Sequence, residues 1–321
     1  MASLITGVGY IGSALARTLL DRGEGVIGLE NGFSTRPSAL RRLADDPGWQ
    51  LVRGSVNRAG SIDRAFAAAG RGETIETVYH LAAQASAHPT AAPPSYTEAT
   101  NLVAPRLVFE AAARHRVERF VYGSSFRVYG DDLAGTVDER RPYGRIGDLA
   151  HLSKVYAEKL VEMLSRQHEL PAANVRLGVV YGLGPTMKRD PRFLTVPNLF
   201  CLRAARRQPL VVHAGANRPI GFLHLDDAVE ALLVAARLGV EPGARSYNAV
   251  SEVLTVGEVA GIVAACARRR GLAVRVEGAA PPPDTRLSVR SGLDDIGFHP
   301  RRAMDESLDE VLAYYLDEGT A

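Results

Sequence analysis

The sequence predicts an α/β fold in which a doubly wound parallel sheet is followed by a smaller C-terminal α/β portion. Three observations lead to this prediction. Short apolar runs alternate with longer amphipathic stretches as far as Arg176, a glycine-rich turn follows the first apolar run, and a carboxylate, Glu30, ends the second. Together they are typical of the Rossmann fold, which places such a turn and such a carboxylate at the same edge of its sheet.

Six apolar runs are read as the strands of this sheet. They are expected at residues 4–6, 26–29, 50–52, 77–81, 119–123 and 174–177. Apolar residues at helical spacing follow the first run and precede the last, at Ile11, Leu15 and Leu19 and at Tyr156, Leu160, Met163 and Leu164. Strands joined by helices of this length form right-handed crossovers, and uninterrupted apolar runs are typical of strands buried on both faces.

The pattern loosens beyond Arg176, where Pro185, Pro191 and Pro197 punctuate a long loop. We therefore expect two domains. Residues 1–176, with roughly 222–250, form the Rossmann domain, and residues 177–221 and 251–321 form a second domain. The second domain should lie over the carboxyl edge of the sheet, where ligands bind in open α/β folds.

Composition excludes several classes of protein. The 321 residues carry 38 basic and 36 acidic side chains, a balance that gives no reason to expect a nucleic-acid or membrane partner. No apolar run reaches the ~20 residues of a membrane span, and the N-terminus lacks the basic region of a signal peptide. Cys201 and Cys266 are far apart in sequence, which fits a reducing cytoplasm without disulfides. The eight histidines show no metal-ligand spacing, so we expect no metal.

The glycine-rich turn has the pattern G-x-G-x-x-G, at Gly7, Gly9 and Gly12. In a dinucleotide site the first glycine permits the turn, the second lets the backbone approach a pyrophosphate, and the third allows close helix–strand packing. The helix that follows offers its free N–H groups to the phosphates. Glu30 ends the second strand, where a carboxylate binds ribose hydroxyls and repels a 2′-phosphate. The cofactor expected here is NAD rather than NADP.

Several further segments extend this pattern along the chain. They are TGVGYIGSALARTLLDRG, VYHLAAQAS, TNLVAPRLVFEAA, FVYGSSFRVYG, LSKVYAEKL, VVYGLGP, GFLHLDDAVEAL and SYNAVSEVLTVGEVA. In these segments the chain resembles the extended short-chain dehydrogenase/reductases, the NAD-dependent epimerase/dehydratase family that acts on nucleotide sugars. It also has some likeness to the family's sulfoquinovose-nucleotide synthases. The glycine turn departs from the family's T-G-x-x-G-x-x-G, because one residue fewer separates Gly7 from Gly9.

The resemblance implies a set of cofactor-binding residues. Gly7, Gly9, Tyr10, Ile11 and Gly12 would surround the pyrophosphate, Glu30 and Asn31 the adenosine ribose, Ser55 and Val56 the adenine, and Leu81, Ala82, Ala83 and Gln84 the inner ribose, with Asn101 and Lys154 nearby. Ser55 stands where the family usually has an aspartate, which removes one adenine contact.

The family's chemistry uses a serine or threonine, a tyrosine and a lysine, and this chain lacks the tyrosine. Ser125 and Lys154 match the first and the last, but Ala150 stands four residues before the lysine, where the tyrosine belongs. The lysine lowers the pKa of the tyrosine, which then accepts the proton of the reacting sugar hydroxyl. Two explanations compete: an engineered tyrosine-to-alanine change that traps substrate, or a natural variant that uses another base or has lost activity. We favour the first, because one targeted change leaves the surrounding site intact.

Three other side chains are weighed as replacement bases. His151 lies three residues before Lys154, Tyr143 precedes the helix, and Tyr156 lies about 200° around the helix from Lys154. For each we prefer a structural interpretation: His151 as a helix-surface or pocket-wall residue, Tyr143 as a loop packing residue, and Tyr156 as a core residue.

The residues after Ser125 bear on the type of reaction. Within the family, dehydratases and decarboxylases carry acidic residues there, whereas this chain has Phe126 and Arg127. We therefore expect C4 epimerisation of a UDP-hexose or UDP-hexuronate through a 4-keto intermediate, with Arg127 either binding a uronate carboxylate or packing on a helix. Alternatives are a sulfoquinovose-synthase-like or decarboxylating enzyme with the same 4-keto chemistry, and a catalytically inactive NAD-binding sensor.

The resemblance also implies substrate contacts and a dimer. The substrate positions are Gln84, Ser125, Phe126, Arg127, Val179, Asn198, Leu199, Val211, His213, Arg218 and Arg286. They would make residues 177–221 and 251–321 a nucleotide-sugar-binding domain. Family members commonly form homodimers through the helices near residues 96–115 and 148–166.

Overall fold

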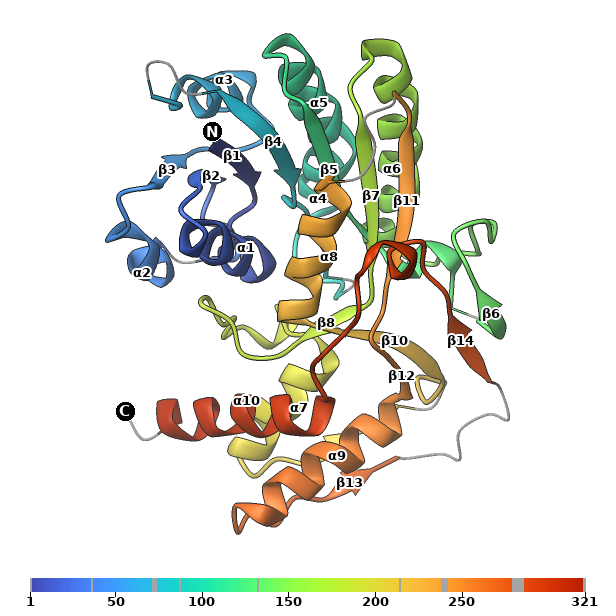
Figure 1. The fold of residues 1–321 in the computed structure, drawn as a ribbon. Coiled ribbons are helices and arrows are strands. Elements are labelled where there is room, and N and C mark those ends of the chain that lie inside the picture. The colour runs from blue at the N-terminus through green and yellow to red at the C-terminus, as the bar shows by residue number, and fades with distance from the viewer. Residues whose placement is uncertain are drawn as a thin grey trace.

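The computed structural model of this chain describes residues 2–35, 37–70, 74–86, 88–131, 133–213, 215–237, 242–278 and 286–319. Its centre is a seven-stranded sheet with the order β11-β7-β5-β4-β1-β2-β3 (Figure 1). The strands are β1 (Ala2–Thr6), β2 (Gly25–Glu30), β3 (Trp49–Arg53), β4 (Ile75–His80), β5 (Arg119–Ser125), β7 (Ala172–Leu177) and β11 (Ala244–Ala249). All neighbours are parallel, so the predicted doubly wound Rossmann sheet is confirmed.

Six of these strands were expected from apolar runs, and β11 was not. Its sequence, ARSYNA, is polar at three of its six positions, and β11 is the edge strand next to β7 and is half-exposed at its start. The strand order reverses between β1 and β4, so the segments that follow these two strands diverge. A ligand site is expected at that switch point.

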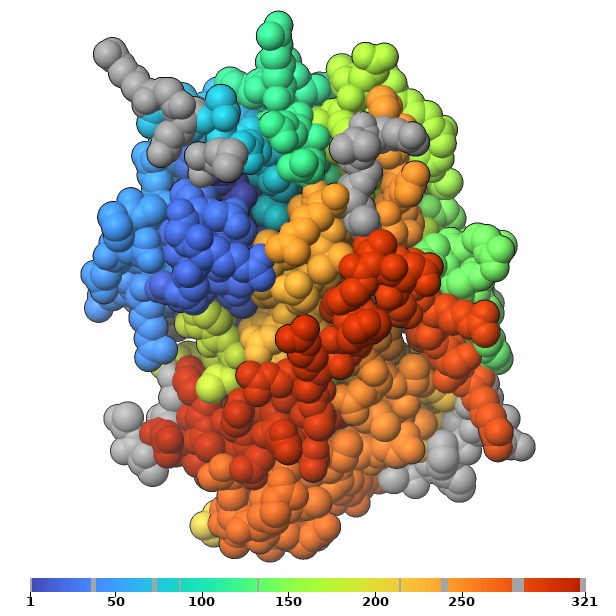
Figure 2. Space-filling model, in the orientation of Figure 1, coloured from blue at the N-terminus to red at the C-terminus, as the bar shows by residue number. Residues whose placement is uncertain are grey.

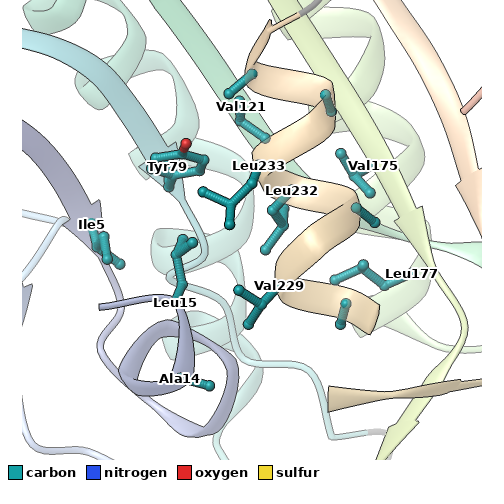
Figure 3. Close-up of a cluster of buried hydrophobic side chains, with 14 of the residues drawn as sticks. Ile5, Ala14, Leu15, Tyr79, Val121, Val175, Leu177, Val229, Leu232 and Leu233 are labelled. Carbon is teal, nitrogen blue, oxygen red and sulfur yellow. The ribbon is translucent and has the colours of Figure 1, made fainter. Parts of the chain in front are cut away.

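Helices cover both faces of the sheet. One face carries α1 (Tyr10–Asp21) and α8 (Leu225–Arg237), and the other carries α3 (Ala59–Ala67), α5 (Ala104–Arg114) and α6 (Leu149–His168). Successive strand residues alternate between the two cores: Ile5 packs on the α1–α8 side, whereas Leu4 packs on the other. Figure 3 shows Val229, Leu232 and Leu233 of α8 against the face of the sheet that also carries α1.

The buried helix faces predicted from the sequence are confirmed in part. Leu15 and Leu19 are buried on α1 as expected. On α6, Leu160 and Leu164 are buried, but Tyr156 and Met163 are 47% and 48% exposed. The interpretation of Tyr156 as a core residue is therefore wrong. The buried face of α6 runs through Ala157, Leu160, Val161 and Leu164, which leaves Tyr156 and Met163 on the outer side.

The remaining elements form a smaller assembly beyond the carboxyl edge of the sheet (Figure 1). A three-stranded sheet joins β8 (Val179–Tyr181), β10 (Pro219–His224) and β12 (Glu252–Thr255), and packs with α7 (Val196–Ala205), α9 (Val256–Arg269) and α10 (Met304–Gly319) around a separate apolar core. Two further strand pairs are β9 (Leu210–Val211) with β13 (Val276–Glu277) and β6 (Gly135–Val137) with β14 (Leu287–Val289).

Short helices complete the connections. They are η1 (Pro37–Leu40), α2 (Arg41–Ala44), α4 (Pro94–Glu98), η2 (Ala99–Val103), η3 (Phe126–Tyr129), η4 (Pro191–Phe193) and η5 (Asp294–Ile296). Figure 2 shows the red C-terminal residues lying across the middle and lower part of the molecule. There the backbone N–H of Arg301 donates to Asp227 of α8 at 3.1 Å, which ties the C-terminal segment to the Rossmann sheet's helix layer. Within the described ranges, no helix is both long and apolar enough to cross a bilayer.

A buried ion pair links α6 to the sheet. Arg176 of β7 donates to Glu158 of α6 at 2.7 Å, and their side chains are only 5% and 1% exposed. The hydroxyls of Ser124 and Tyr143 donate to the same carboxylate, at 2.5 and 3.0 Å. Arg176 also contacts the Tyr129 hydroxyl. This network fixes the height of α6 relative to the ends of β5 and β7.

Glu158→Ala should destabilise the protein by about 3–5 kcal/mol, because it leaves the Arg176 guanidinium buried without its counter-charge. The matched control is Glu162→Ala on the same helix. Glu162 pairs with the exposed Lys159 at 3.0 Å, and such surface pairs contribute about 0–1 kcal/mol. Urea unfolding measures both. Equal losses for the two variants would contradict a special role for the buried pair.

Candidate active site

The turn between β1 and α1 is shaped by two glycines that have no room for a side chain. Gly7 has a φ of +82°, and a Cβ on it would lie 2.5 Å from the backbone of Ala82, in the segment after β4. A Cβ on Gly12 would lie 2.2 Å from the Gly7 carbonyl oxygen. Gly7 therefore permits the turn, and Gly12 lets α1 come close to the strand, as the G-x-G-x-x-G fingerprint requires.

The N-terminus of α1 is open to an anion. The helix begins at Tyr10, and its N-cap, Gly9, provides no side chain to bind the first N–H groups. Free N–H groups at a helix start attract phosphate oxygens. Ile11, the second residue of α1, is partly buried against the core.

Glu30 stands at the carboxyl end of β2, beside this turn. Burial raises the pKa of its carboxyl, and hydrogen bonds from nearby backbone N–H groups, including Gly32 at 2.8 Å, partly offset this. Asn31 follows and donates to the Tyr96 hydroxyl at 3.0 Å. Glycine turn, uncapped helix and carboxylate together fit the pyrophosphate and ribose of a dinucleotide.

The adenine positions are only partly available to a ligand. Val56 is 4% exposed and packs in the core, so its side chain does not face the carboxyl edge. The Ser55 hydroxyl accepts from the Asn57 backbone at 3.2 Å. An adenine ring would therefore contact the backbone of Ser55 and Val56.

The segment after β4 forms the opposite wall. Leu81 donates its backbone N–H to Thr6 at 2.9 Å, which fixes Leu81, Ala82 and Ala83 beside the glycine turn. Asn101 is 1% exposed, and its amide exchanges two 2.8 Å hydrogen bonds with the Gln84 backbone. Asn101 also donates to Ser153 of α6 at 2.9 Å. Its amide thus positions the wall and α6 relative to each other.

The side chain of Lys154 reaches the end of β5, where Ser125 lies. The Lys154 ammonium donates to the Gly123 carbonyl at 2.6 Å and lies 4.7 Å from the centre of the Tyr122 ring. Burial lowers the pKa of this lysine to about 8, although Glu158 opposes the shift. Ser125, two residues after Gly123, ends β5 and accepts from the Arg127 backbone at 3.3 Å. Ala150 is 5% exposed, one turn before Lys154 on α6.

The residues weighed as replacement bases differ in their surroundings. Tyr143 donates to Glu158, and burial together with that carboxylate raises the pKa of its hydroxyl, which suits packing rather than proton transfer. Tyr156 faces outward. His151 is 13% exposed, and its Nδ1 lies 2.8 Å from both oxygens of Asp148.

The two residues after Ser125 have different environments. Phe126 is 4% exposed and packs edge-on against Tyr129. Arg127 is partly exposed and contacts Asp131 at 2.6 Å and Asp148 at 3.9 Å. Arg218 contacts the same Asp131 at 3.0 Å. The side chains of Arg127 and Arg218, named from sequence, are therefore bridged by Asp131. Sequence reasoning missed Asp131, and it also missed Asp148, which contacts Arg127 alone.

The other predicted substrate residues are spread over the smaller assembly. Val179 pairs with Phe222 in the three-stranded sheet, Val211 lies on β9, Leu199 lies on α7, and His213 and Arg286 are exposed. Asn198 accepts from the Gly182 backbone at 3.2 Å and donates to the Tyr10 hydroxyl at 3.3 Å. It joins α7 to α1 rather than standing apart from the glycine turn.

The segment after β8 spans the carboxyl edge. The Tyr10 hydroxyl donates to the Gly182 carbonyl, Ser13 and Thr186 share a hydrogen bond of 2.8 Å, and Arg192 donates to the Thr90 carbonyl at 2.9 Å. These contacts connect α1 and the segment after β4 to the smaller assembly across the predicted cofactor position.

Comparisons with known proteins agree with this geometry. The chain is 24% identical to UDP-glucose 4-epimerase of Mycolicibacterium smegmatis, over 98% of both chains. It is 27% identical to UDP-glucuronic acid decarboxylase 1 of Arabidopsis thaliana, over 71% of this chain and 49% of that one. The crystal structure of Thermus thermophilus UDP-glucose 4-epimerase, a complex with NAD, superposes with a TM-score of 0.80 at 26% identity, covering 98% of this chain and 99% of that one.

The burial of Lys154 should also make the stability of the protein depend on pH. A lysine whose folded pKa is about 8 binds fewer protons than the unfolded chain between pH 8 and 10.5. Stability therefore gains from deprotonation as pH rises through this window, and the cost of the buried ammonium is present in full below it. In Lys154→Met this contribution is absent, so the unfolding free energy of the unaltered protein should rise relative to the variant from pH 8 to 10.

Lys159→Met is the matched control, because Lys159 is 60% exposed on the same helix. Its difference from the unaltered protein shows the effect of removing an exposed ammonium from α6 over the same pH range. Urea unfolding at pH 7, 8, 9 and 10 measures all three proteins. Parallel curves for the Lys154 variant would refute the depressed pKa.

A profile of one family matches residues 3–249, most of the chain. The chain belongs to the NAD dependent epimerase/dehydratase family.

Proposed function

We propose that this protein is an NAD-dependent nucleotide-sugar epimerase that inverts C4 of a UDP-hexose or UDP-hexuronate through a 4-keto sugar. One observation carries the proposal: the glycine turn, Glu30, Ser125 and Lys154 all lie at one edge of one sheet. Bound NAD would accept a hydride from C4 of the sugar and return it. The cofactor's binding in the structure of the Thermus relative supports this assignment.

The residues of this chain would bind and orient the substrate. Lys154, held at the Gly123 carbonyl, would place a cation beside the reacting hydroxyl, where developing negative charge is stabilised. Ser125 would hydrogen-bond the same oxygen. Residues 1–176 with roughly 222–250 would hold the cofactor, and residues 177–221 and 251–321 the nucleotide sugar. The separate apolar core around α7, α9 and α10 supports this division.

The environment of Phe126 and Arg127 favours epimerisation over elimination. Neither side chain is an acid, Phe126 is buried, and Arg127 is paired with Asp131. Loss of water or of carbon dioxide would need an acid–base group beside the 4-keto sugar. The second candidate is a decarboxylating enzyme, which the similarity to the Arabidopsis decarboxylase favours.

The partly exposed pairing of Arg127 is compatible with a hexuronate. Its partner Asp131 is itself partly exposed, and such pairs are weak in water. A substrate carboxylate can therefore displace Asp131 and form the bidentate contact that arginine favours.

The function is tested by product analysis with the family base restored. With NAD, Ala150→Tyr should convert one of UDP-glucose, UDP-galactose, UDP-glucuronate or UDP-galacturonate into its C4 epimer, as observed by NMR. Ala150→Phe has the same bulk without the hydroxyl and should not exceed the unaltered protein. A UDP-pentose product would favour decarboxylation, and silence of all three proteins without NAD binding would refute the proposal.

We also propose that the protein is a homodimer joined through α6 and the neighbouring η2–α5 helix. Leu152, Tyr156 and Met163 line one outer face of α6, each about half exposed, and Val103 of η2 is 52% exposed beside them. An apolar surface of this kind on a soluble protein marks an interaction site. A second copy related by a twofold axis would place the same apolar surface against it.

Met163→Glu should convert the dimer to a monomer, because two carboxylates would be brought together in an apolar interface. Arg275→Glu, at an 86% exposed position just before β13 and away from α6 in Figure 1, is the control that should leave the dimer intact. Light scattering coupled to size-exclusion chromatography measures the mass. A monomeric unaltered protein would refute the proposal.

A further inference from the structure

The N-terminus of α6 carries an acid–base pair beside the missing tyrosine. Asp148 is the N-cap of the helix, and its carboxylate accepts from the His151 backbone at 3.0 Å. The same carboxylate contacts Nδ1 of the His151 ring at 2.8 Å. Both side chains are mostly buried, at 24% and 13% exposed. A capping aspartate needs only the hydrogen bond from a backbone N–H of the first turn. The contact between Asp148 and the His151 ring is therefore not required for capping.

This pair lies close to the side chain of Arg127, in the segment that follows Ser125. Asp148 lies 3.9 Å from the guanidinium of Arg127, which belongs to η3, directly after Ser125. The hydroxyl of Ser125 in turn accepts from the Arg127 backbone. His151 directly follows Ala150 and lies one turn before Lys154 on α6. The first turn of α6 thus carries an imidazole next to the position of the missing tyrosine.

The contact with Asp148 prepares the ring for proton transfer. When Nδ1–H donates to the carboxylate, Nε2 carries the lone pair and accepts a proton, and the carboxylate then stabilises the imidazolium. Burial opposes the charge of Asp148, but the hydrogen bonds from His151 outweigh it and hold the pKa of the carboxyl below its usual value. The acid therefore stays ionised when the ring needs it.

We propose that His151, oriented by Asp148, is the proton acceptor that replaces tyrosine in this chain. This rests on the function proposed above and selects the natural-variant explanation of Ala150. In the forward direction the O–H bond at C4 of the sugar would break and its proton would move to Nε2 as the ketone forms; NAD, when bound, would supply the acceptor for the C4 hydride. In the return direction C4 would regain the hydride on its other face, and the imidazolium would give the proton back to the oxygen.

The surrounding departures from the family pattern support a natural variant. Ser55 also stands where the family usually has an aspartate, so Ala150 is not an isolated change.

The first test compares variants of the pair in the full chain. His151→Gln should lower kcat by about 100-fold or more, the usual contribution of a general base. NAD and UDP binding, measured by isothermal titration calorimetry, should be unchanged. His168→Gln, at the exposed end of the same helix, is the control and should retain full activity.

The second test separates catalysis from folding. Asparagine caps helices as well as aspartate does, so Asp148→Asn should keep the stability of α6. It should lower kcat and move the acid limb of the pH–rate profile to lower pH, because the imidazolium loses its counter-charge. A purely structural Asp148 would leave that limb in place.

Other titratable or charged groups lie on the elements that pack against this end of α6 and can also affect the pH–rate profile. They are Arg127, Asp131, Arg218, Tyr96, Glu98, Tyr122, Arg176, Lys154 and Glu158. None of these is changed in the Asp148 variant, so a shift of the limb reports the pair.

The outcomes separate this proposal from the one on which it rests. Full activity of His151→Gln would overturn the role of His151. An inactive unaltered protein that gains turnover with Ala150→Tyr would overturn it too, while leaving the epimerase function standing. If the double variant Ala150→Tyr/His151→Gln neither turns over a UDP-sugar nor binds NAD, both proposals fail. Turnover by the unaltered protein that disappears in His151→Gln and returns in the double variant supports both.

Discussion

The contact between the glycine turn and the segment after β4 is the constraint on which the site depends. Gly7 leaves no space for a Cβ against Ala82, and Gly12 leaves none against Gly7. These approaches bring α1, β1 and β4 together where the strand order reverses. Any side chain there would separate the helix start from the wall that Asn101 and Gln84 form. The geometry of the carboxyl edge therefore depends on the missing Cβ atoms of Gly7 and Gly12 rather than on an added side-chain contact.

Most of the sheet could be predicted from the sequence because buried parallel strands are apolar throughout. The runs around Leu4, Ile27 and Val121 give that signal, whereas β11 does not, since half of this edge strand's residues are polar. The stripe on α6 was misread for a related reason. Tyr156 and Met163 are apolar but face outward, and apolarity alone does not distinguish a core face from an exposed one.

The site was predictable where a local motif defines it and not where distant residues meet. The glycine turn, Glu30 and Lys154 belong to motifs with fixed spacing. Asp148 was missed although its position before a helix, three residues ahead of His151, is the signal of an N-cap. Asp131 carries no such signal, because its contacts with Arg127 and Arg218 depend on how η3 meets the start of β10. Spacing along the chain does not encode that meeting.

The late position of α8 and β11 in the chain has a consequence for synthesis on the ribosome. The core face formed by Ile5, Val121 and Val175 is covered by α8, which ends at Arg237, and the sheet is completed only by β11. More than two thirds of the polypeptide must therefore emerge before this apolar face is enclosed. Until then the nascent chain exposes a surface that chaperones recognise, so its yield in the cell should depend on their supply.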